Sequence, residues 1–118
     1  MATSAANDCL YCVVAHGAIL RIRAPDPYLA DQIAVDWRKA PLPARLKAVL
    51  EVAVRLAVAP AEVTAADFGA LQWHGLTQDD IWDVGAIVSF FALSNRLAHW
   101  AAIQPNAEFF LLGRLPRG

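Results

Sequence analysis

The sequence predicts an all-α fold, and three observations carry that prediction. Valine, isoleucine, threonine and aromatic residues never alternate with polar residues over a length that would make a strand. Signals that begin and end helices recur along the whole chain. Of the 118 residues, 58% are hydrophobic, enough for one domain with a substantial core. We therefore expect residues 1–118 to form a single helical bundle of about five to six helices.

The first two helices are predicted between N-cap and proline signals. Asn7 is a suitable N-cap for a helix that runs to about Arg23, because two X-Pro dipeptides follow directly. A shorter helix is expected from Pro27 to Trp37, with proline in its favoured first position. These signals place an unbroken helix over the stretch that carries both cysteines.

The third helix is predicted from Pro41-Leu42-Pro43 to about Ala59, and Pro60 ends it. Its apolar positions recur at helical spacing. They are Leu46, Val49, Leu50, Ala53, Leu56 and Ala57. Charged residues four positions apart, including Glu51, occupy the other side, where ion pairs add slight support.

Two capping boxes predict the last two helices. Thr64-Ala-Ala-Asp67 begins one that ends at His74-Gly75, and Thr77-Gln-Asp-Asp80 begins a long one that runs to about Ala102. Residues 84–93 carry no charge on any face, so this long helix is expected to be the buried centre of the bundle. The tail from Pro105 to Gly118 is expected to be irregular.

Charge and composition exclude some classes of partner and favour one. The net charge is only −1 and the ten basic residues are scattered, which argues against nucleic-acid and anionic-membrane surfaces. The sequence shows no targeting signal, and its longest apolar stretch is half of what a membrane span requires. We therefore expect a cytoplasmic protein. Its high apolar content for so short a chain predicts contact with further copies of itself.

The stretch that carries chemistry is Cys9-x-x-Cys12-x-x-x-His16. At roughly 100° per residue these three side chains fall within about 60° of one another on a helix. The helix N-terminus stabilises a thiolate, and a nearby imidazole can accept a thiol proton. The charge of Asp8 acts in the opposite direction and favours the protonated thiol. Two thiols and a base are the groups that two-electron redox chemistry requires.

Other interpretations of the cysteine pair differ in what they require. A c-type haem is excluded because Val13, not histidine, follows the second cysteine. A thioredoxin domain would need a preceding strand, which the sequence lacks. A zinc site would add His74 or His99 to the motif, and two inert buried cysteines are also possible. Redox chemistry is the interpretation that the spacing favours.

The motif, placed at a helix start in an all-helical chain, resembles the alkylhydroperoxidase D-like (AhpD-like) family of the carboxymuconolactone decarboxylase superfamily. Residues 80–96 resemble the long helix of its peroxidase-related branch, and residues 105–110 resemble its tail. Together these similarities extend from about Ser4 to Arg114.

The resemblance implies a role for each motif residue. Cys12 would attack a hydroperoxide and become a sulfenic acid, Cys9 would condense with it, and His16 would belong to the proton relay. An external thiol or dithiol would supply electrons, with no metal, flavin or other cofactor. Family members are typically helical oligomers. The alternatives are a thiol–disulfide oxidoreductase and a non-catalytic helical oligomerisation module.

The resemblance also implies a relay glutamate about a dozen residues before the first cysteine. Only eight residues precede Cys9, so we expect this chain to lack the usual N-terminal helices of the family. Asp8, Glu51 and Asp83 are the candidate replacements, and Asp83 would need a partner because it enters the apolar stretch.

The remaining polar and aromatic residues are expected to be structural. Asn95 and Arg96 interrupt the apolar helix, so they are predicted to satisfy buried polar partners or a subunit contact. His74 and His99 lie near helix C-termini, where a cation favours the dipole. The four tryptophans are predicted to pack in the core or at an interface.

Overall fold

The protein is all-α in a computed structural model that describes residues 1–114, and this range contains no strand. The α-helices are α1 Ala2–Ala6, α2 Leu10–Arg23, α3 Leu29–Asp36, α4 Ala44–Val58, α5 Ala65–Trp73, α6 Gln78–Trp100 and α7 Ala107–Leu111. Two short 3₁₀-helices, η1 Trp37–Lys39 and η2 Pro60–Glu62, follow α3 and α4. The predicted fold class is thus confirmed, and the helices beyond those expected are the five-residue α1 and α7.

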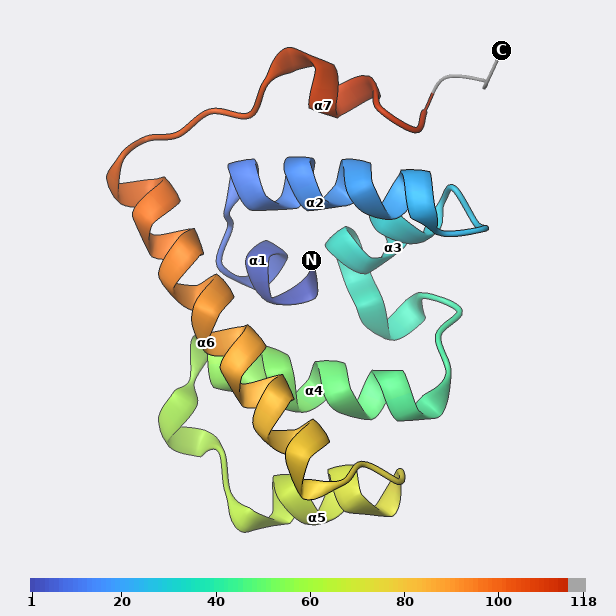
Figure 1. Ribbon diagram of the computed structural model, residues 1–118, viewed down its shortest axis with the longest axis vertical. Helices are drawn as coiled ribbons and strands as arrows, with labels where there is room; N and C mark the ends of the chain where they lie inside the picture. Colours follow the sequence, from blue (N-terminus) through green and yellow to red (C-terminus); the bar gives the residue numbers. More distant parts are fainter. Residues whose placement is uncertain (115–118) are drawn as a thin grey trace.

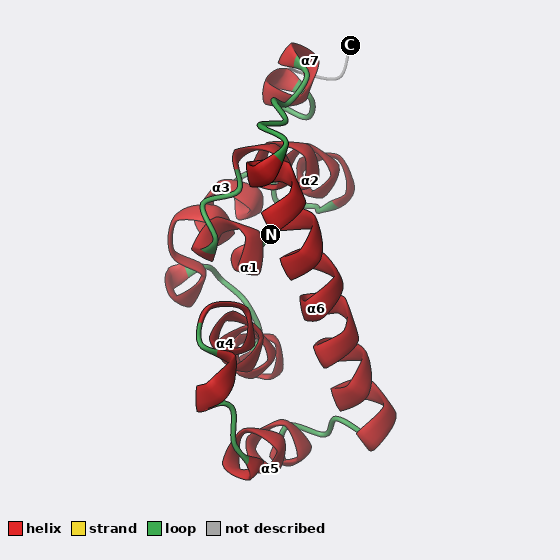
Figure 2. Cartoon of the chain, turned by 90° about the vertical axis from the view of Figure 1, so that its left-hand side faces the viewer, coloured by secondary structure: helices red, strands yellow, loops and turns green. Residues whose placement is uncertain are grey.

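One long helix stands beside a stack of shorter ones. Helices α2, α1, α4 and α5 lie one above another, and α6 runs along all of them (Figures 1 and 2). Helix α3 packs against α2, and α7 covers the outer side of α2 (Figure 1). This arrangement brings the start of α2 next to the last turns of α6.

The start of α2 differs from the prediction. The chain forms α1, ends it at Asn7, and turns at Asp8, whose φ of 53° lies in the left-handed region. Cys9, not Asn7, is therefore the N-cap of α2. Asn7 is instead the C-cap of α1, and the turn at Asp8 separates it from the first residues of α2.

The middle helices follow their local signals. Helix α4 begins after Pro43, and both capping boxes are formed, at Thr64 and at Thr77. Gly75 ends the α5 turn with a φ of 84°, a conformation that glycine adopts without a steric penalty. These boundaries agree with the prediction within one or two residues.

The prediction that α6 is a buried central helix is wrong. Its buried residues are Val88, Asn95 and Ala98, all on the side that faces the stack. The opposite side is an exposed apolar stripe, which we call the α6 stripe. It consists of Trp82, Ala86, Phe90, Leu93, Leu97 and Trp100. Asp83 is exposed as well, so it needs no buried partner. The apolar composition of α6 identified surface that can be buried, but no element among residues 1–114 covers this side of the helix.

Helix α6 also meets the length and composition of a membrane-spanning helix, with a mean hydropathy of 1.2 over 18 residues. A single helix of this kind is weak evidence for a membrane span, because helices of water-soluble proteins satisfy the same criteria. Here one side of α6 packs against α1, α4 and α5, which is the behaviour of a helix within a folded domain.

The tail was expected to be irregular, but residues 107–111 form α7. Arg21, buried in α2, donates from Nε to the carbonyl of Leu112 (2.8 Å) and from Nη2 to that of Phe109 (2.9 Å). Arg114 adds a bidentate ion pair with Asp31 at 2.7 and 2.8 Å. Arginine contacts from α2, which no local pattern reveals, hold this helix in place. Residues 115–118 of the tail lie outside the described part.

The core consists of several small clusters. Trp37 packs with Ala2 and Ile33 in the largest of them, as expected for a core tryptophan. A second cluster contains Cys9, Cys12 and Ala98, with Tyr11 packed against it. The thiols therefore lie where the start of α2 meets the end of α6.

Candidate active site

Cys9 and Cys12 lie together at the N-terminus of α2. Cys9 is the N-cap, and its Sγ accepts a hydrogen bond from the backbone N–H of Cys12 at 3.4 Å. Both residues are 1% exposed, and both thiols are free. The helix thus directs an amide donor at the first sulfur, an arrangement that stabilises a thiolate or a disulfide-exchange transition state.

The surroundings of the two sulfurs differ. Burial raises the pKa of the Cys9 thiol, and the neighbouring Cys12 thiol adds to this. The Cys12 N–H and the Asn95 side chain partly offset the rise. The Cys12 Sγ lies 3.9 Å from the hydroxyl oxygen of Ser94 on α6. Each sulfur therefore contacts α6 through a polar side chain.

Asn95 connects α6 to the turn that carries Cys9. Its amide donates to the hydroxyl of Ser4 at 2.9 Å, and its Oδ1 accepts from the amide of Asn7 at 3.2 Å. The backbone N–H of Cys9 donates to the carbonyl of Ser4 at 3.0 Å. The prediction that Asn95 satisfies buried polar partners is confirmed. Arg96, in contrast, is exposed and donates to the carbonyl of Ala92 in its own helix.

His16 lies one helical turn after Cys12 and is half-buried. Its ring packs edge-on against Phe91, with 5.0 Å between ring centroids. Burial lowers the pKa of His16, and the positive charge of the Met1 amino group adds to the effect. A lowered pKa favours the uncharged imidazole, which is the form that can accept a proton. Within residues 1–114 no hydrogen bond joins it to either thiol.

A small cavity of about 110 Å³ opens beside Cys9, and we call it the Cys9 cavity. It lies between the start of α2 and the end of α6, and Cys12 is not among its lining residues. The lining residues are Asp8, Cys9, Leu10, Tyr11, Ala98, His99, Ala102, Ile103 and Gln104. Cys9 is therefore the cysteine of the pair that borders this cavity.

The three candidate replacements for a relay glutamate lie in different places. Asp8 lines the Cys9 cavity, next to the first cysteine. Glu51 is paired with Arg38 and Arg55 on the far side of α4. Asp83 is exposed near the start of α6. Only Asp8 of the three is therefore close to the thiols.

The histidines that a zinc site would recruit are separated. His74 caps the C-terminus of α5, near the start of α6, whereas His99 lies in the last turn of α6. Among residues 1–114, no three side chains of histidine, cysteine, aspartate or glutamate are placed to hold a metal ion. His99 instead lies against the cysteine turn, with its Nε2 2.8 Å from the carbonyl oxygen of Asn7.

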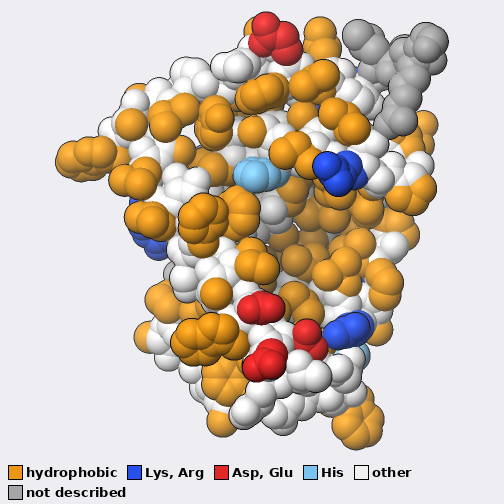
Figure 3. Space-filling model, viewed as in Figure 1, with side chains coloured by type: hydrophobic (Ala, Val, Ile, Leu, Met, Phe, Trp, Pro, Cys, Tyr) orange, Lys and Arg blue, Asp and Glu red, His pale blue; other side chains and the backbone are white. Residues whose placement is uncertain are grey.

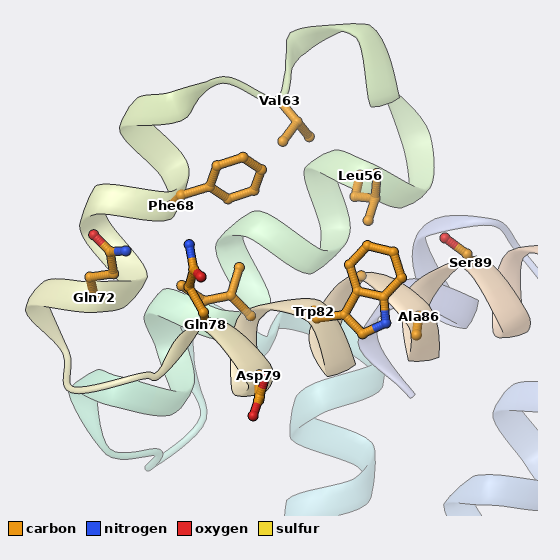
Figure 4. Close-up of a pocket in the computed structure, with 11 residues that line it drawn as sticks. Leu56, Val63, Phe68, Gln72, Gln78, Asp79, Trp82, Ala86 and Ser89 are labelled. Carbon is orange, nitrogen blue, oxygen red and sulfur yellow. The ribbon is translucent and has the colours of Figure 1, made fainter.

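A second, much larger hollow of about 1000 Å³ lies between α4, α5 and the first half of α6. Leu56, Phe68 and Trp82 turn toward its common space (Figure 4). The lining of this groove extends along α6 as far as Ser89 and includes neither cysteine. Apolar side chains also cover much of the outer face along α6 (Figure 3).

Comparison with solved structures identifies the class of protein. The fold matches an alkylhydroperoxidase AhpD core, an uncharacterized peroxidase-related protein from Ralstonia eutropha JMP134, with a TM-score of 0.92 and 56% identity over 98% of this chain. It matches an uncharacterized peroxidase-related protein from Silicibacter sp. TM1040 with a TM-score of 0.92 and 40% identity over 96% of this chain. By fold and sequence the chain is thus similar to AhpD-like, peroxidase-related proteins, the family that its motif and long helix resemble.

The chain spans 61% and 59% of the length of these two proteins. No family model matches the sequence, and no curated protein matches it either.

Proposed function

We propose that the protein is a thiol-dependent peroxidase that reduces organic hydroperoxides through Cys12 and Cys9. The observation that carries this proposal is the buried pair of free thiols at the N-terminus of α2, with the His16 imidazole one turn away. The likeness to solved peroxidase-related proteins supports it. No metal or organic cofactor is required, and the cytoplasm would keep the thiols reduced between turnovers.

In the proposed reaction His16 accepts the proton of the Cys12 thiol. The Cys12 thiolate then attacks the outer peroxide oxygen and breaks the O–O bond, which leaves Cys12 as a sulfenic acid. His16 returns its proton to the departing alkoxide, so an alcohol is released. The Cys9 thiol displaces water from that sulfenic acid and forms the disulfide. Ser94, beside the Cys12 sulfur, can hydrogen-bond the sulfenic oxygen. Asp8 is the carboxylate that we propose in place of the relay glutamate, because it is the candidate beside the pair.

The test is a free-thiol count with intact mass, before and after one equivalent of cumene hydroperoxide. Wild type should lose both thiols and about 2 Da. Cys9→Ser should stop at a sulfenic acid that dimedone traps, and Cys12→Ser should remain reduced. Thiols that survive the peroxide in the wild type would contradict the proposal.

A second candidate function is disulfide exchange with other thiols. The observation that favours it is the Cys9 cavity, which is lined by Cys9 and not by Cys12. If this is the main activity, the protein should reduce glutathione disulfide faster than it reduces cumene hydroperoxide.

We also propose that the protein assembles with copies of itself through the α6 stripe and the neighbouring groove. Trp82 and Trp100 are 77% and 89% exposed, respectively, and contiguous apolar patches of this kind mark interaction sites.

A further inference from the structure

The thiol motif on α2 and the inner side of α6 contact each other in matching steps. Ser94 lies 3.9 Å from the Cys12 sulfur, and the Phe91 ring lies against the His16 ring, with 5.0 Å between their centroids. On each helix the two residues are one turn apart, so the contacts run in opposite directions along α2 and α6. The proposed mechanism gives a role to three of these four residues and leaves Phe91 without one.

His16 has no hydrogen bond within residues 1–114 that fixes the direction of its ring. Its ring contact is the edge-on packing against Phe91, with an angle of 82° between the two ring planes. A histidine base usually has its second ring nitrogen held by a carboxylate or a carbonyl, which sets the orientation of the imidazole. Here an aromatic ring takes the place of that hydrogen-bond partner.

The Phe91 ring also keeps water away from one side of the imidazole. Both residues are half-buried. Burial is the largest cause of the lowered pKa of His16, because an imidazolium loses hydration when apolar atoms cover it. The uncharged imidazole is the form that takes the proton of the Cys12 thiol. The ring therefore acts on both properties that the base requires, its direction and its protonation state.

Few charged groups of the described residues act on His16. From α1 the positive charge of the Met1 amino group adds to the lowered pKa. The facing residues of α6 carry no charge. Arg21, together with the ion pair that joins α3 to α7, lies about 140° away around α2, since five positions separate it from His16. Asp8 and His99 lie at the Cys9 cavity, which His16 does not line.

From these contacts we propose that Phe91 is the positioning residue of His16. Its ring covers the imidazole and holds it on the face of α2 that carries the Cys12 thiol, in place of a hydrogen-bonded partner. The inference rests on the proposed function for the step that it serves, which is the transfer of the thiol proton. Phe91 acts through His16 and exchanges no proton itself.

The first test follows the His16 ring by NMR titration of the reduced protein, with no peroxide present. Phe91→Ala opens one side of the imidazole to water, so the His16 signals should titrate at higher pH than in the wild type, where burial lowers the pKa. Phe91→Tyr keeps an aromatic ring and should titrate with the wild type. His16→Asn assigns the signals, and those of His74 and His99 are internal controls that should be the same in all variants.

An unchanged titration of His16 in Phe91→Ala would overturn the inference, and so would a Phe91→Tyr variant that behaves like Phe91→Ala. A wild-type His16 that titrates at the usual value of about 6.5 would overturn it as well. If Phe91→Ala does not fold, Phe91→Gln replaces it. The glutamine fills the space with a polar side chain and should move the titration in the same direction.

The second test measures whether Phe91 acts through His16. In the Cys9→Ser background, cumene hydroperoxide at pH 7 converts Cys12 to a sulfenic acid that dimedone traps. Phe91→Ala should slow this step at least about tenfold, a part of the whole effect of a general base, and Phe91→Tyr should keep the wild-type rate. When His16→Asn is also present, Phe91→Ala should cause no further loss, because its effect requires the imidazole. No slowing, or equal slowing with and without His16, would overturn the positioning role.

The two tests separate this inference from the proposed function. If the wild-type thiols survive the peroxide while the titrations behave as stated, the peroxidase proposal alone is wrong. If Cys12 reacts with peroxide while Phe91→Ala changes neither the titration of His16 nor the rate, the positioning role alone is wrong.

Discussion

Asn95 is the only residue of α6 with a fully buried polar side chain, and its partners lie on either side of the turn that carries Cys9. The amide therefore links the longest helix to the thiol pair. Without Asn95, the hydroxyl of Ser4 stays buried but loses its hydrogen-bond donor. The folded state is then destabilised, because the same hydroxyl can bond to water in the unfolded chain. The position of the first cysteine thus depends on a residue 86 positions away in the sequence.

We predict that Asn95→Ala lowers the free energy of unfolding by about 2 kcal/mol, from lost hydrogen bonds and incomplete packing. It should also speed the labelling of Cys9 by 5,5′-dithiobis(2-nitrobenzoate) in a Cys12→Ser background, because the turn loses its anchor. Urea unfolding and absorbance at 412 nm measure the two effects. The adjacent Arg96→Ala is the matched control and should change stability by less than about 0.5 kcal/mol. Equal effects of the two substitutions would contradict the role given to Asn95.

The parts of the site that could be predicted from the sequence are those whose residues lie close together along the chain. Cys9, Cys12 and His16 were identified because their spacing is local and chemically specific. His99 was assigned a structural role at a helix end, since its contact with Asn7 joins positions that no periodicity relates. The N-cap position of Cys9 was also missed, because Asn7 is the better capping residue by type and only the turn at Asp8 excludes it.

At the scale of the helices, the elements with strong local signals were predicted and the short ones were not. Thr64 and Thr77 specify helix starts through their own hydrogen bonds, so α5 and α6 begin where expected. Helices α1 and α7 have five residues each, too few for stability without tertiary support. Their existence depends on α4, α6 and Arg21, which are distant in the sequence.

Helix α7 provides a test of this dependence. Arg21→Met keeps most of the buried stem but removes the donors to Phe109 and Leu112. We expect the amides of residues 107–112 to lose protection in hydrogen exchange, while those of α4 change little. Arg114→Ala is the control, because its exposed pair with Asp31 is worth about 0–1 kcal/mol. If Arg114→Ala releases α7 as completely as Arg21→Met does, the surface pair rather than Arg21 holds the helix.

At the scale of the whole molecule, the distribution of apolar surface is the feature that the sequence alone could not give. Composition showed an excess of hydrophobic residues, which was interpreted both as a buried long helix and as contacts between copies. The structure places that excess on the outer side of α6. The α6 stripe contains three aromatic residues, each able to bury about 150–250 Å². Together with Leu93 and Leu97, they approach the ~800 Å² per partner of a standard interface.

Self-association through this surface can be tested by placing charge on it. Wild type should sediment as an oligomer at micromolar concentration, and Phe90→Glu/Leu97→Glu should sediment as a monomer, because each buried carboxylate would need a partner that the stripe does not offer. Both positions are already exposed within one chain, so the circular dichroism spectrum should not change. Val35→Glu is the matched control, since Val35 is an 87% exposed apolar residue on α3, away from the stripe. A wild type that sediments as a monomer would contradict self-association, and a double variant that keeps the wild-type mass would show that another surface forms the interface.

The thiol pair lies on the side of α6 that faces the stack, so the monomeric variant should retain the reactivity of Cys9.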